Sequence, residues 1–420
     1  MVRASVANLI AKIILNFRNV KRWGRNAKVF VATEILFGVP MSWIVFYRVI
    51  FMKSLGLSEV LIGLLISMPY LFQMFLPMLG GHLADKFGRK RVLMVFDSMG
   101  WLGAMIMWYI ARGPLLIVAA MLFEGLATTI IGVWETLLVE DTELSYRTGI
   151  YSYLQLIYIF AGLLTPVAGI LISLYGLDQG CRYMFLIALM ALVIIFVSYQ
   201  MFLRESEIGK MLSSPKSQDA SVSESGYVET LRKIAKDKKL AIAFSLTIMG
   251  SIQYPLTNTY RPLYLSDSRA LALDASIISV IPMASSIPSL IALSFVVPRL
   301  RHTRIREALL FSYACGISGL VALMLAPRGN LTLAVLSAVL DSARYVAVTA
   351  ILRVLLVNTI DETSPLARAK IMSLVTTFSA LVTWPTPIVG GYLYAIRPAL
   401  PFALCILFLV LSIGLISRIS

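Results

Sequence analysis

Five carboxylates interrupt long apolar stretches of this sequence: Glu34, Asp97, Glu124, Glu135 and Asp341. A charged side chain at the centre of a lipid bilayer costs about 2.5–3.5 kcal/mol on insertion scales, so each needs a partner or a role. An apolar environment disfavours the charged form of a carboxyl group, which suits such groups to bind and release a proton. We take Glu34, Glu124, Glu135 and Asp341 as candidates for proton coupling. Asp97 lies close to the basic segment 86–91 and is interpreted as its structural partner.

The spacing of these acids predicts which of them act together. Glu124 and Glu135 are eleven residues apart, which places them only about 20° apart around one helix. Asp341 and Arg344 are three residues apart and can pair within one turn. Two interpretations of that pair stay open: a neutralised structural element, or a pair of groups that hydrogen-bonds a polar solute.

Other polar and aromatic side chains are candidates for the wall of a cavity. Tyr254, Asn258 and Arg261 fall on one helical face. The cavity candidates are Gln253, Tyr254, Asn258, Arg344, Tyr345 and Trp384. The three cysteines lie far apart, so the sequence predicts neither a metal site nor a disulfide framework.

The elements that carry these residues are apolar enough to cross a membrane. Hydrophobic residues make up 59% of the 420 residues and charged residues 14%, with a mean hydropathy of +0.83. An ordinary soluble domain has about 45–50% and about 25%, so a soluble enzyme is excluded. Windows of roughly 20 apolar residues suffice to cross the bilayer. They predict twelve spans, at 28–50, 59–80, 91–111, 114–139, 149–174, 183–203, 240–265, 275–297, 307–326, 330–357, 369–395 and 399–417.

Basic residues are distributed unevenly between the two ends of these spans. Of 37 lysines and arginines, 27 lie in the amino-terminal arm, the even-numbered connections and the carboxyl tail, and only Arg344 and Arg353 are counted inside a span. The excess predicts that both termini are cytoplasmic, in a multi-pass protein of the cell membrane. The resulting domains are an arm at 1–27, a six-helix bundle at 28–203, a linker at 204–239, a second bundle at 240–417 and a tail at 418–420.

The arm and the net charge of +15 predict contact with a lipid surface rather than with nucleic acid. Leu9 and Ile13 fall at helical spacing opposite Lys12 and Arg18, a pattern that suits an anionic inner leaflet. A solvated basic arm is the alternative interpretation.

The two bundles share a sequence repeat. At an offset of 221, Arg147 meets Arg368, and Thr165-Pro166 with Gly169 meets Thr386-Pro387 with Gly390. Matched arginines and prolines indicate duplication, so we predict an all-α protein with two pseudo-symmetric six-helix bundles. Helices are expected to bend or to pack closely at Pro166, Gly169, Pro387 and Gly390.

The connection between the second and third spans carries a specific motif. It reads GHLADKFGRKR from Gly81 to Arg91, in which Gly88 permits a tight turn. This stretch resembles the G-x-x-x-D-[RK]-x-G-R-[RK] signature of the major facilitator superfamily and matches it at each specified position. Twelve spans in two halves are also similar to that family. The resemblance implies that spans one, four, seven and ten line a central cavity.

The resemblance also implies a conformational latch at the cytoplasmic end. Asp85 would cap the start of the eleventh span, and Arg89 would pair with Glu140 or Asp141. These contacts are expected to form when the cavity opens outward and to break when it opens inward. The expected latch comprises Gly81, Asp85, Gly88, Arg89, Lys90, Glu140 and Asp141.

The sequence favours transport over catalysis. It predicts a secondary active transporter that acts as a monomer, without a cofactor other than protons or another coupling ion. Within that class we favour proton-coupled export of amphipathic or cationic small molecules, because the fifth span, with Pro166 and Gly169, is similar to an element of exporters in the superfamily. The alternatives are an importer of a sugar, an amino acid or an organic ion, and a transporter-like sensor without flux.

Overall fold

The computed structural model describes residues 20–205, 225–300, 304–363 and 368–418. Most of the predicted arm, residues 1–19, and most of the predicted linker, residues 206–224, lie outside the described residues. The first bundle contains α2 (Arg25–Ser54), α3 (Glu59–Gln73), α4 (Leu76–Phe87), α5 (Arg89–Ile110), α6 (Pro114–Ala127), η2 (Thr128–Ile130), α7 (Ile131–Val139), α8 (Leu144–Leu163) and α9 (Pro166–Phe202), preceded by η1 (Val20–Arg22). The second half contains α11 (Ser225–Lys236), α12 (Lys238–Ser266), η3 (Ile277–Ser279), α13 (Val280–Ile291), η4 (Ala292–Val296), η5 (Val297–Arg299), α14 (Ile305–Leu325), α15 (Leu331–Val346), η7 (Ala347–Ile351), α16 (Leu352–Thr363), α17 (Arg368–Thr383), α18 (Thr386–Ile396) and α19 (Leu400–Ile416).

Local sequence explains where several helices begin and end. Ser58 and Asn330 accept hydrogen bonds from the backbone N–H groups of Leu61 and Leu333, which satisfies donors at the starts of α3 and α15. Gly88 separates α4 from α5 and has φ of 91°, a conformation that favours glycine. The motif glycine therefore provides the sharp turn that the sequence predicts.

The helices account for twelve membrane crossings. Ten helical stretches of the described residues are long and apolar enough to span a bilayer, and α19 is a shorter apolar helix. One of the ten, Leu144–Phe202, has 59 residues and would be about 88 Å long if it were straight. Gly176, with φ of 76°, breaks it, so it crosses twice. The sequence predicted a connection between residues 174 and 183, but the structure has only the break at Gly176 between the fifth and sixth spans.

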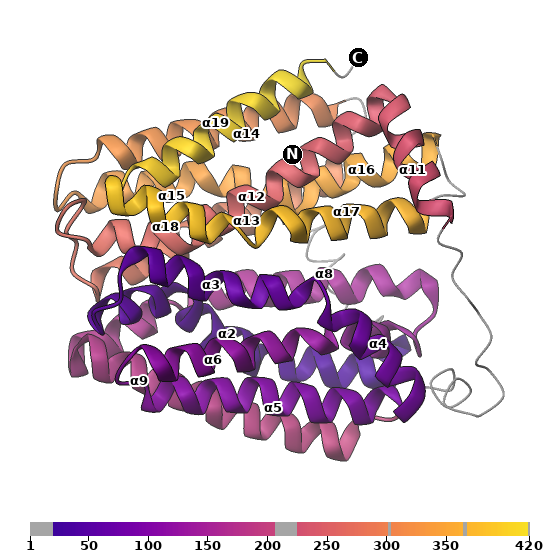
Figure 1. Cartoon of the computed structure of the whole chain (residues 1–420), viewed down its shortest axis with the longest axis horizontal. Coiled ribbons are helices and arrows are strands. Elements are labelled where there is room, and N and C mark those ends of the chain that lie inside the picture. Colours follow the sequence, from indigo (N-terminus) through magenta and orange to yellow (C-terminus); the bar gives the residue numbers. More distant parts are fainter. Residues whose placement is uncertain (1–19, 206–224, 301–303, 364–367, 419–420) are drawn as a thin grey trace, which may run out of the picture.

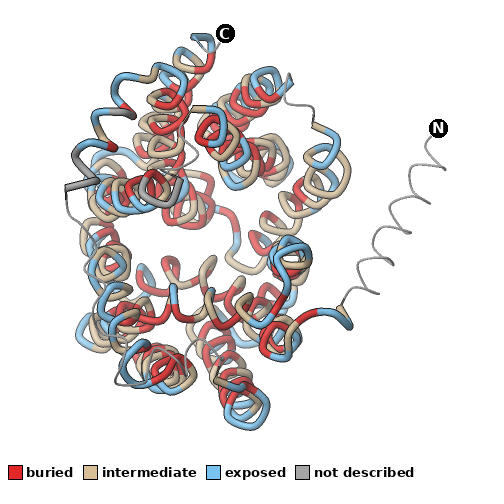
Figure 2. Tube along the Cα trace, turned by 90° about the vertical axis from the view of Figure 1, so that its right-hand side faces the viewer, coloured by how far each residue is buried: buried red, intermediate tan, exposed pale blue. Residues whose placement is uncertain are grey.

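The crossings form two packed groups, which confirms the predicted fold class. In Figure 1 the helices of the first half (indigo to magenta) lie below those of the second half (orange to yellow), with all long helices running roughly along one direction. Figure 2 shows the two groups from the end, each with buried residues turned toward its own interior. Large apolar side chains such as Val193, Val197 and Leu407 are exposed, as a lipid-facing surface requires.

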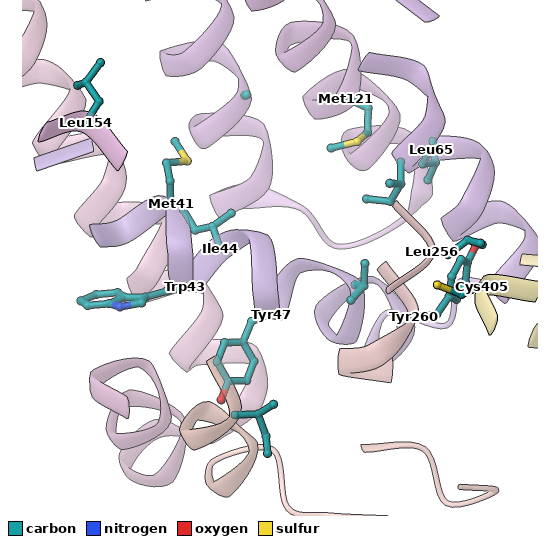
Figure 3. Packing of buried hydrophobic residues seen from close by; sticks show 14 of the residues in the cluster. Met41, Trp43, Ile44, Tyr47, Leu65, Met121, Leu154, Leu256, Tyr260 and Cys405 are labelled. Carbon is teal, nitrogen blue, oxygen red and sulfur yellow. The ribbon is translucent and has the colours of Figure 1, made fainter. Parts of the chain in front are cut away.

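Buried apolar side chains fill the interior of both halves. Figure 3 shows Met41, Ile44 and Met121 of the first half, and Leu256 and Tyr260 of the second. All five belong to one continuous core cluster. The two halves are therefore in direct packing contact at this level of the molecule.

Candidate functional site

A cavity of about 490 Å³ lies between the two halves. We call it the central cavity. Residues of α2 and α8 line it from the first half, and residues of α12, α13 and α15 line it from the second. The fourth span, which the resemblance implied as part of the wall, contributes none of the described lining residues. Polar lining is frequent: Ser42, Tyr158, Asn258, Ser285, Ser286, Ser289, Ser342 and Tyr345 all contact the cavity.

A buried cluster of three charges lies in the wall of the central cavity. Arg344 donates from Nε to Asp341 Oδ1 at 2.5 Å and from Nη2 to Asp341 Oδ2 at 2.9 Å. Arg261 Nη2 lies 2.9 Å from the same Asp341 Oδ2. The side chains of Asp341 and Arg344 are each 5% exposed and that of Arg261 is 13% exposed. One carboxylate is thus shared by two guanidinium groups, which leaves the cluster with one net positive charge.

Four of the six predicted cavity residues line the central cavity. They are Tyr254, Asn258, Arg344 and Tyr345. Gln253 and Trp384 are not among the described residues that line it, so their predicted place was wrong. Gln253 is fully buried because one position along a helix turns a side chain by about 100°, away from the face of Tyr254.

Glu124 is a partner of an arginine rather than a solitary acid. Arg48 of α2 donates from Nη1 to Glu124 Oε2 at 2.9 Å, and Trp108 donates from Nε1 to Glu124 Oε1 at 2.8 Å. The count of basic residues had assigned Arg48 and Arg261 to connections, but both lie inside helices. The 3₁₀ turn Thr128–Ile130 interrupts the fourth span between Glu124 and Glu135, so the predicted common face was wrong.

A second cavity of about 230 Å³ lies inside the first half. We call it the bundle cavity. It is lined by Glu34, Asp97 and Glu135, together with aromatic side chains. Tyr158 donates its hydroxyl to Glu34 Oε1 at 2.6 Å and also lines the central cavity. Of the four proton-coupling candidates only Asp341 lines the central cavity, while Glu34 and Glu135 line the bundle cavity.

The predicted latch residues lie toward the end of the molecule that carries α4, α11 and α16 in Figure 1, and several of them pair there. We call this the inner end because the charge distribution predicts it to be cytoplasmic. Arg89 forms an ion pair with Glu140. Asn26 donates from Nδ2 to Asp141 Oδ2 at 3.2 Å. Lys90 donates from Nζ to the carbonyl oxygens of Gln200 and Leu203 at 3.0 and 2.9 Å.

Sequence reasoning missed Glu205 at this end. Its carboxylate accepts from the backbone N–H groups of Arg89 and Lys90 at 3.0 and 2.9 Å, at the start of α5 where a negative charge is favoured. Asp85 is exposed, and in the described part of the chain it has no hydrogen bond or ion pair, with α17 or otherwise. A Cβ at Gly81 would meet no atom within 4 Å, so nothing in the described chain packs closely against this glycine.

The two halves contact each other at the opposite, outer end. Tyr47 donates its hydroxyl to the carbonyl oxygen of Ala275 at 2.7 Å, and Arg269 Nη2 lies 2.5 Å from Glu59 Oε1. Burial raises the pKa of the neighbouring Asp267 carboxyl, but the hydrogen bonds and charge of Arg269 lower it by more, so the pKa lies below its ordinary value. Glycine packing brings α3 and α18 together, because a Cβ at Gly63 would lie 2.2 Å from the carbonyl oxygen of Pro387. The outer end is therefore closed.

One pair of the expected latch is present although the outer end is closed. The pair of Arg89 with Glu140 was expected to form when the cavity opens outward and to break when it opens inward, and it is formed in this conformation. Arg89 and Glu140 both belong to the first half, so their ion pair does not depend on contact between the halves. The same holds for Lys90 and for Glu205, which directly follows α9.

The predicted bend residues lie at matched helix breaks. Pro166 is the first residue of α9 after the break that follows α8, and Pro387 is the second residue of α18 after the break that follows α17. A Cβ at Gly169 would lie 2.3 Å from the carbonyl oxygen of Ser276, and one at Gly390 would lie 2.3 Å from Tyr260. Each glycine thus permits close packing against another element.

Comparison with known proteins identifies the family. A family model described as the Major Facilitator Superfamily matches residues 30–383. The chain belongs to this superfamily. No curated protein sequence matches the chain.

Solved structures of superfamily transporters share the fold. The nucleoside transporter NupG has a TM-score of 0.66 and 17% identity, with 94% of this chain and 96% of that chain covered. The inward-facing and unoccupied structure of a bacterial homologue of the human lysosomal transporter Spinster has a TM-score of 0.65 and 12% identity, with coverage of 93% and 95%. The xylose transporter XylE from E. coli, in a partially occluded inward open conformation, has a TM-score of 0.64 and 14% identity, with coverage of 94% and 97%.

Proposed function

We propose that this superfamily member is a secondary active transporter whose central cavity binds a polar small molecule that carries a negative charge. The observation that supports this proposal is the shared carboxylate of Asp341, which leaves one of its two arginines without full charge compensation. Nε of Arg261 is buried without a hydrogen-bond partner among the described residues, and its Nη2 is close to Asp341 without the alignment of a hydrogen bond. Buried donors without partners are costly, so a ligand that accepts from them gains affinity.

The rest of the cavity wall suits a solute with hydroxyl, amide or carboxylate groups. Asn258, Tyr345 and the serines of α13 supply both donors and acceptors. The neighbours NupG and XylE are described as nucleoside and xylose transporters, which is consistent with a polar solute. A cationic compound, which the sequence favoured, would meet the net positive charge of the cluster. The geometry therefore supports the alternative of an organic ion, and specifically an anion.

Transport measurements with the purified protein in proteoliposomes test the anion proposal. Exchange of radiolabelled substrates is measured for a panel of small carboxylates, phosphorylated and neutral sugars, nucleosides and quaternary ammonium compounds. We expect anionic members to be exchanged, and we expect Arg261→Gln to raise their KM about tenfold or more, because a charged hydrogen bond of about 1.5–3 kcal/mol is lost. Arg328→Gln, at an exposed position of an outer connection, is the matched control. Exchange of cations alone, or an unchanged KM in the Arg261 variant, would contradict the proposal.

We further propose that Glu34 binds the coupling proton. Glu124 forms an ion pair with Arg48, and Asp341 forms ion pairs with Arg261 and Arg344, so each of these carboxylates already has a cation beside it. Glu34 is buried, and its one hydrogen bond in the described chain is from the hydroxyl of Tyr158. Because Tyr158 also lines the central cavity, a change of charge at Glu34 can act on the substrate-binding region through one side chain.

Accumulation driven by an imposed pH gradient tests the coupling. We expect Glu34→Gln to abolish gradient-driven accumulation while substrate exchange without a gradient continues, because the amide cannot carry the proton. Glu307→Gln, at an exposed position at the start of α14, controls for the loss of one carboxyl group. The same vesicles separate export from import: an acidic interior drives accumulation by antiport, which we propose, and an acidic exterior drives it by symport. Undiminished accumulation in the Glu34 variant would exclude this residue as the proton carrier.

A further inference from the structure

The bundle cavity holds buried carboxyl groups for which the described wall supplies no cation. Glu34 is 4% exposed and Asp97 is 7% exposed, and both line this cavity. Asp97 was expected to partner the basic segment 86–91, yet it has no hydrogen bond or ion pair to any described residue. No lysine or arginine occurs among the described residues that line the cavity.

Asp97 has no basic partner in the described chain because two nearby cationic side chains bind other groups. Arg89 pairs with Glu140, and Lys90 donates to two backbone carbonyl oxygens at the end of α9. These bonds direct both side chains to the inner end, away from Asp97. A buried carboxylate without a cation is costly, so a ligand with positive charge would be stabilised here.

Aromatic side chains make up much of the remaining wall. Trp101, Trp134, Phe37 and Tyr199 line the cavity, and the rings of Phe37 and Trp101 meet edge to face with centroids 5.3 Å apart. Indole and phenol faces attract organic cations, which is how aromatic cages bind quaternary ammonium groups. A metal cation such as Na⁺ or Mg²⁺ instead requires a shell of oxygen ligands. The cavity volume of about 230 Å³ is below the range of roughly 300–1,000 Å³ usual for drug-sized ligands, so a small ligand fits best.

We propose that the bundle cavity binds a small organic monocation of the alkylammonium class, with Asp97 and Glu34 as its charge partners and Trp101 and Trp134 as its aromatic faces. The site goes beyond the proposed transport of an anion, because it lies within one half of the molecule rather than between the halves. A proton on Glu34 and an organic cation in the cavity disfavour each other, since both neutralise the same carboxylate.

Equilibrium binding to the purified full-length protein in detergent tests the site without any transport. Radiolabelled choline is the probe, and unlabelled tetramethylammonium is the competitor. We expect saturable binding, and we expect Asp97→Asn to weaken it at least tenfold. Trp134→Phe is expected to weaken binding less, because phenylalanine keeps an aromatic face of lower electrostatic attraction. Asp178→Asn, at an outer position whose side chain is 47% exposed, is the matched control and should bind as the parent does.

Three competitors and one fallback variant keep the proposal falsifiable. The neutral carbon isostere of choline, 3,3-dimethylbutan-1-ol, should fail to compete, and Na⁺ and K⁺ should compete only at much higher concentration. Competition by the neutral alcohol at the same concentration, or unchanged affinity in Asp97→Asn, would overturn the proposal. Displacement by Na⁺ at the concentration of tetramethylammonium would make the site one for inorganic cations and overturn it as well. If Asp97→Asn does not fold, Glu34→Gln takes its place with the same expectation.

Discussion

Asp341→Asn is expected to lower the free energy of unfolding by about 3–5 kcal/mol, because it leaves two buried guanidinium groups without their carboxylate. The three side chains are between 5% and 13% exposed, so water screens them weakly. Arg344 keeps its hydrogen bond to Thr257 Oγ1 at 3.1 Å, which neutralises none of its charge. The measurement is equilibrium unfolding of the purified protein in detergent, followed by intrinsic fluorescence.

A double variant separates charge imbalance from loss of contact. Arg344→Gln alone should cost less than Asp341→Asn, since Asp341 keeps Arg261 as a partner. Asp341→Asn combined with Arg344→Gln should recover a large part of the lost stability, because only one buried charge then remains. If the double variant is less stable than Asp341→Asn by the full cost of Arg344→Gln, the two residues act independently and the proposed charge balance is wrong.

The sequence was most informative where both partners lie on one helix or where a family motif names one of them. Asp341 and Arg344 pair as their spacing of three residues predicts. Arg89 pairs with Glu140, one of the two acids that the motif implied. The spacing of three residues fixes the first pair without any knowledge of how helices pack, whereas Arg89 and Glu140 are 51 positions apart and their pairing was implied by the family resemblance alone.

Contacts between helices distant in the sequence were not predictable in the same way. Arg48 and Glu124 are 76 positions apart, and no pattern in the sequence reports which faces of α2 and α6 meet. The 3₁₀ turn Thr128–Ile130 has no proline or glycine to signal it, so the angle between Glu124 and Glu135 was calculated for an uninterrupted helix. Asp97 is close to the basic segment along the chain, but the side chain of Arg89 pairs with Glu140 and that of Lys90 donates to backbone carbonyl oxygens.

Gly63→Ala is expected to shift the protein toward conformations that are open at the outer end and to reduce transport at least tenfold. A Cβ at this position would lie 2.2 Å from the carbonyl oxygen of Pro387 and 2.7 Å from the hydroxyl oxygen of Tyr260. The nearest atom belongs to the backbone of α18, which cannot move aside as a flexible side chain can. In the Gly63→Ala variant the contact between α3 and α18 is therefore overpacked. Overpacking costs about 1–3 kcal/mol, and each 1.4 kcal/mol shifts an equilibrium tenfold.

The same substitution in an open environment provides the control, and thiol labelling provides the readout. A Cβ at Gly132 of α7 meets no atom within 4 Å, so Gly132→Ala should leave both conformation and transport unchanged. With the native cysteines replaced, Ser42→Cys reports access to the central cavity, since Ser42 lines it. A membrane-impermeant thiol reagent added to the outer side should label this cysteine faster in Gly63→Ala than in Gly132→Ala. Equal labelling and equal transport in the two variants would mean that the approach of α3 to α18 does not close the outer end. In that case Tyr47 and the pair of Arg269 with Glu59 would have to hold it closed by themselves, although each contributes only a hydrogen bond or a partly exposed ion pair.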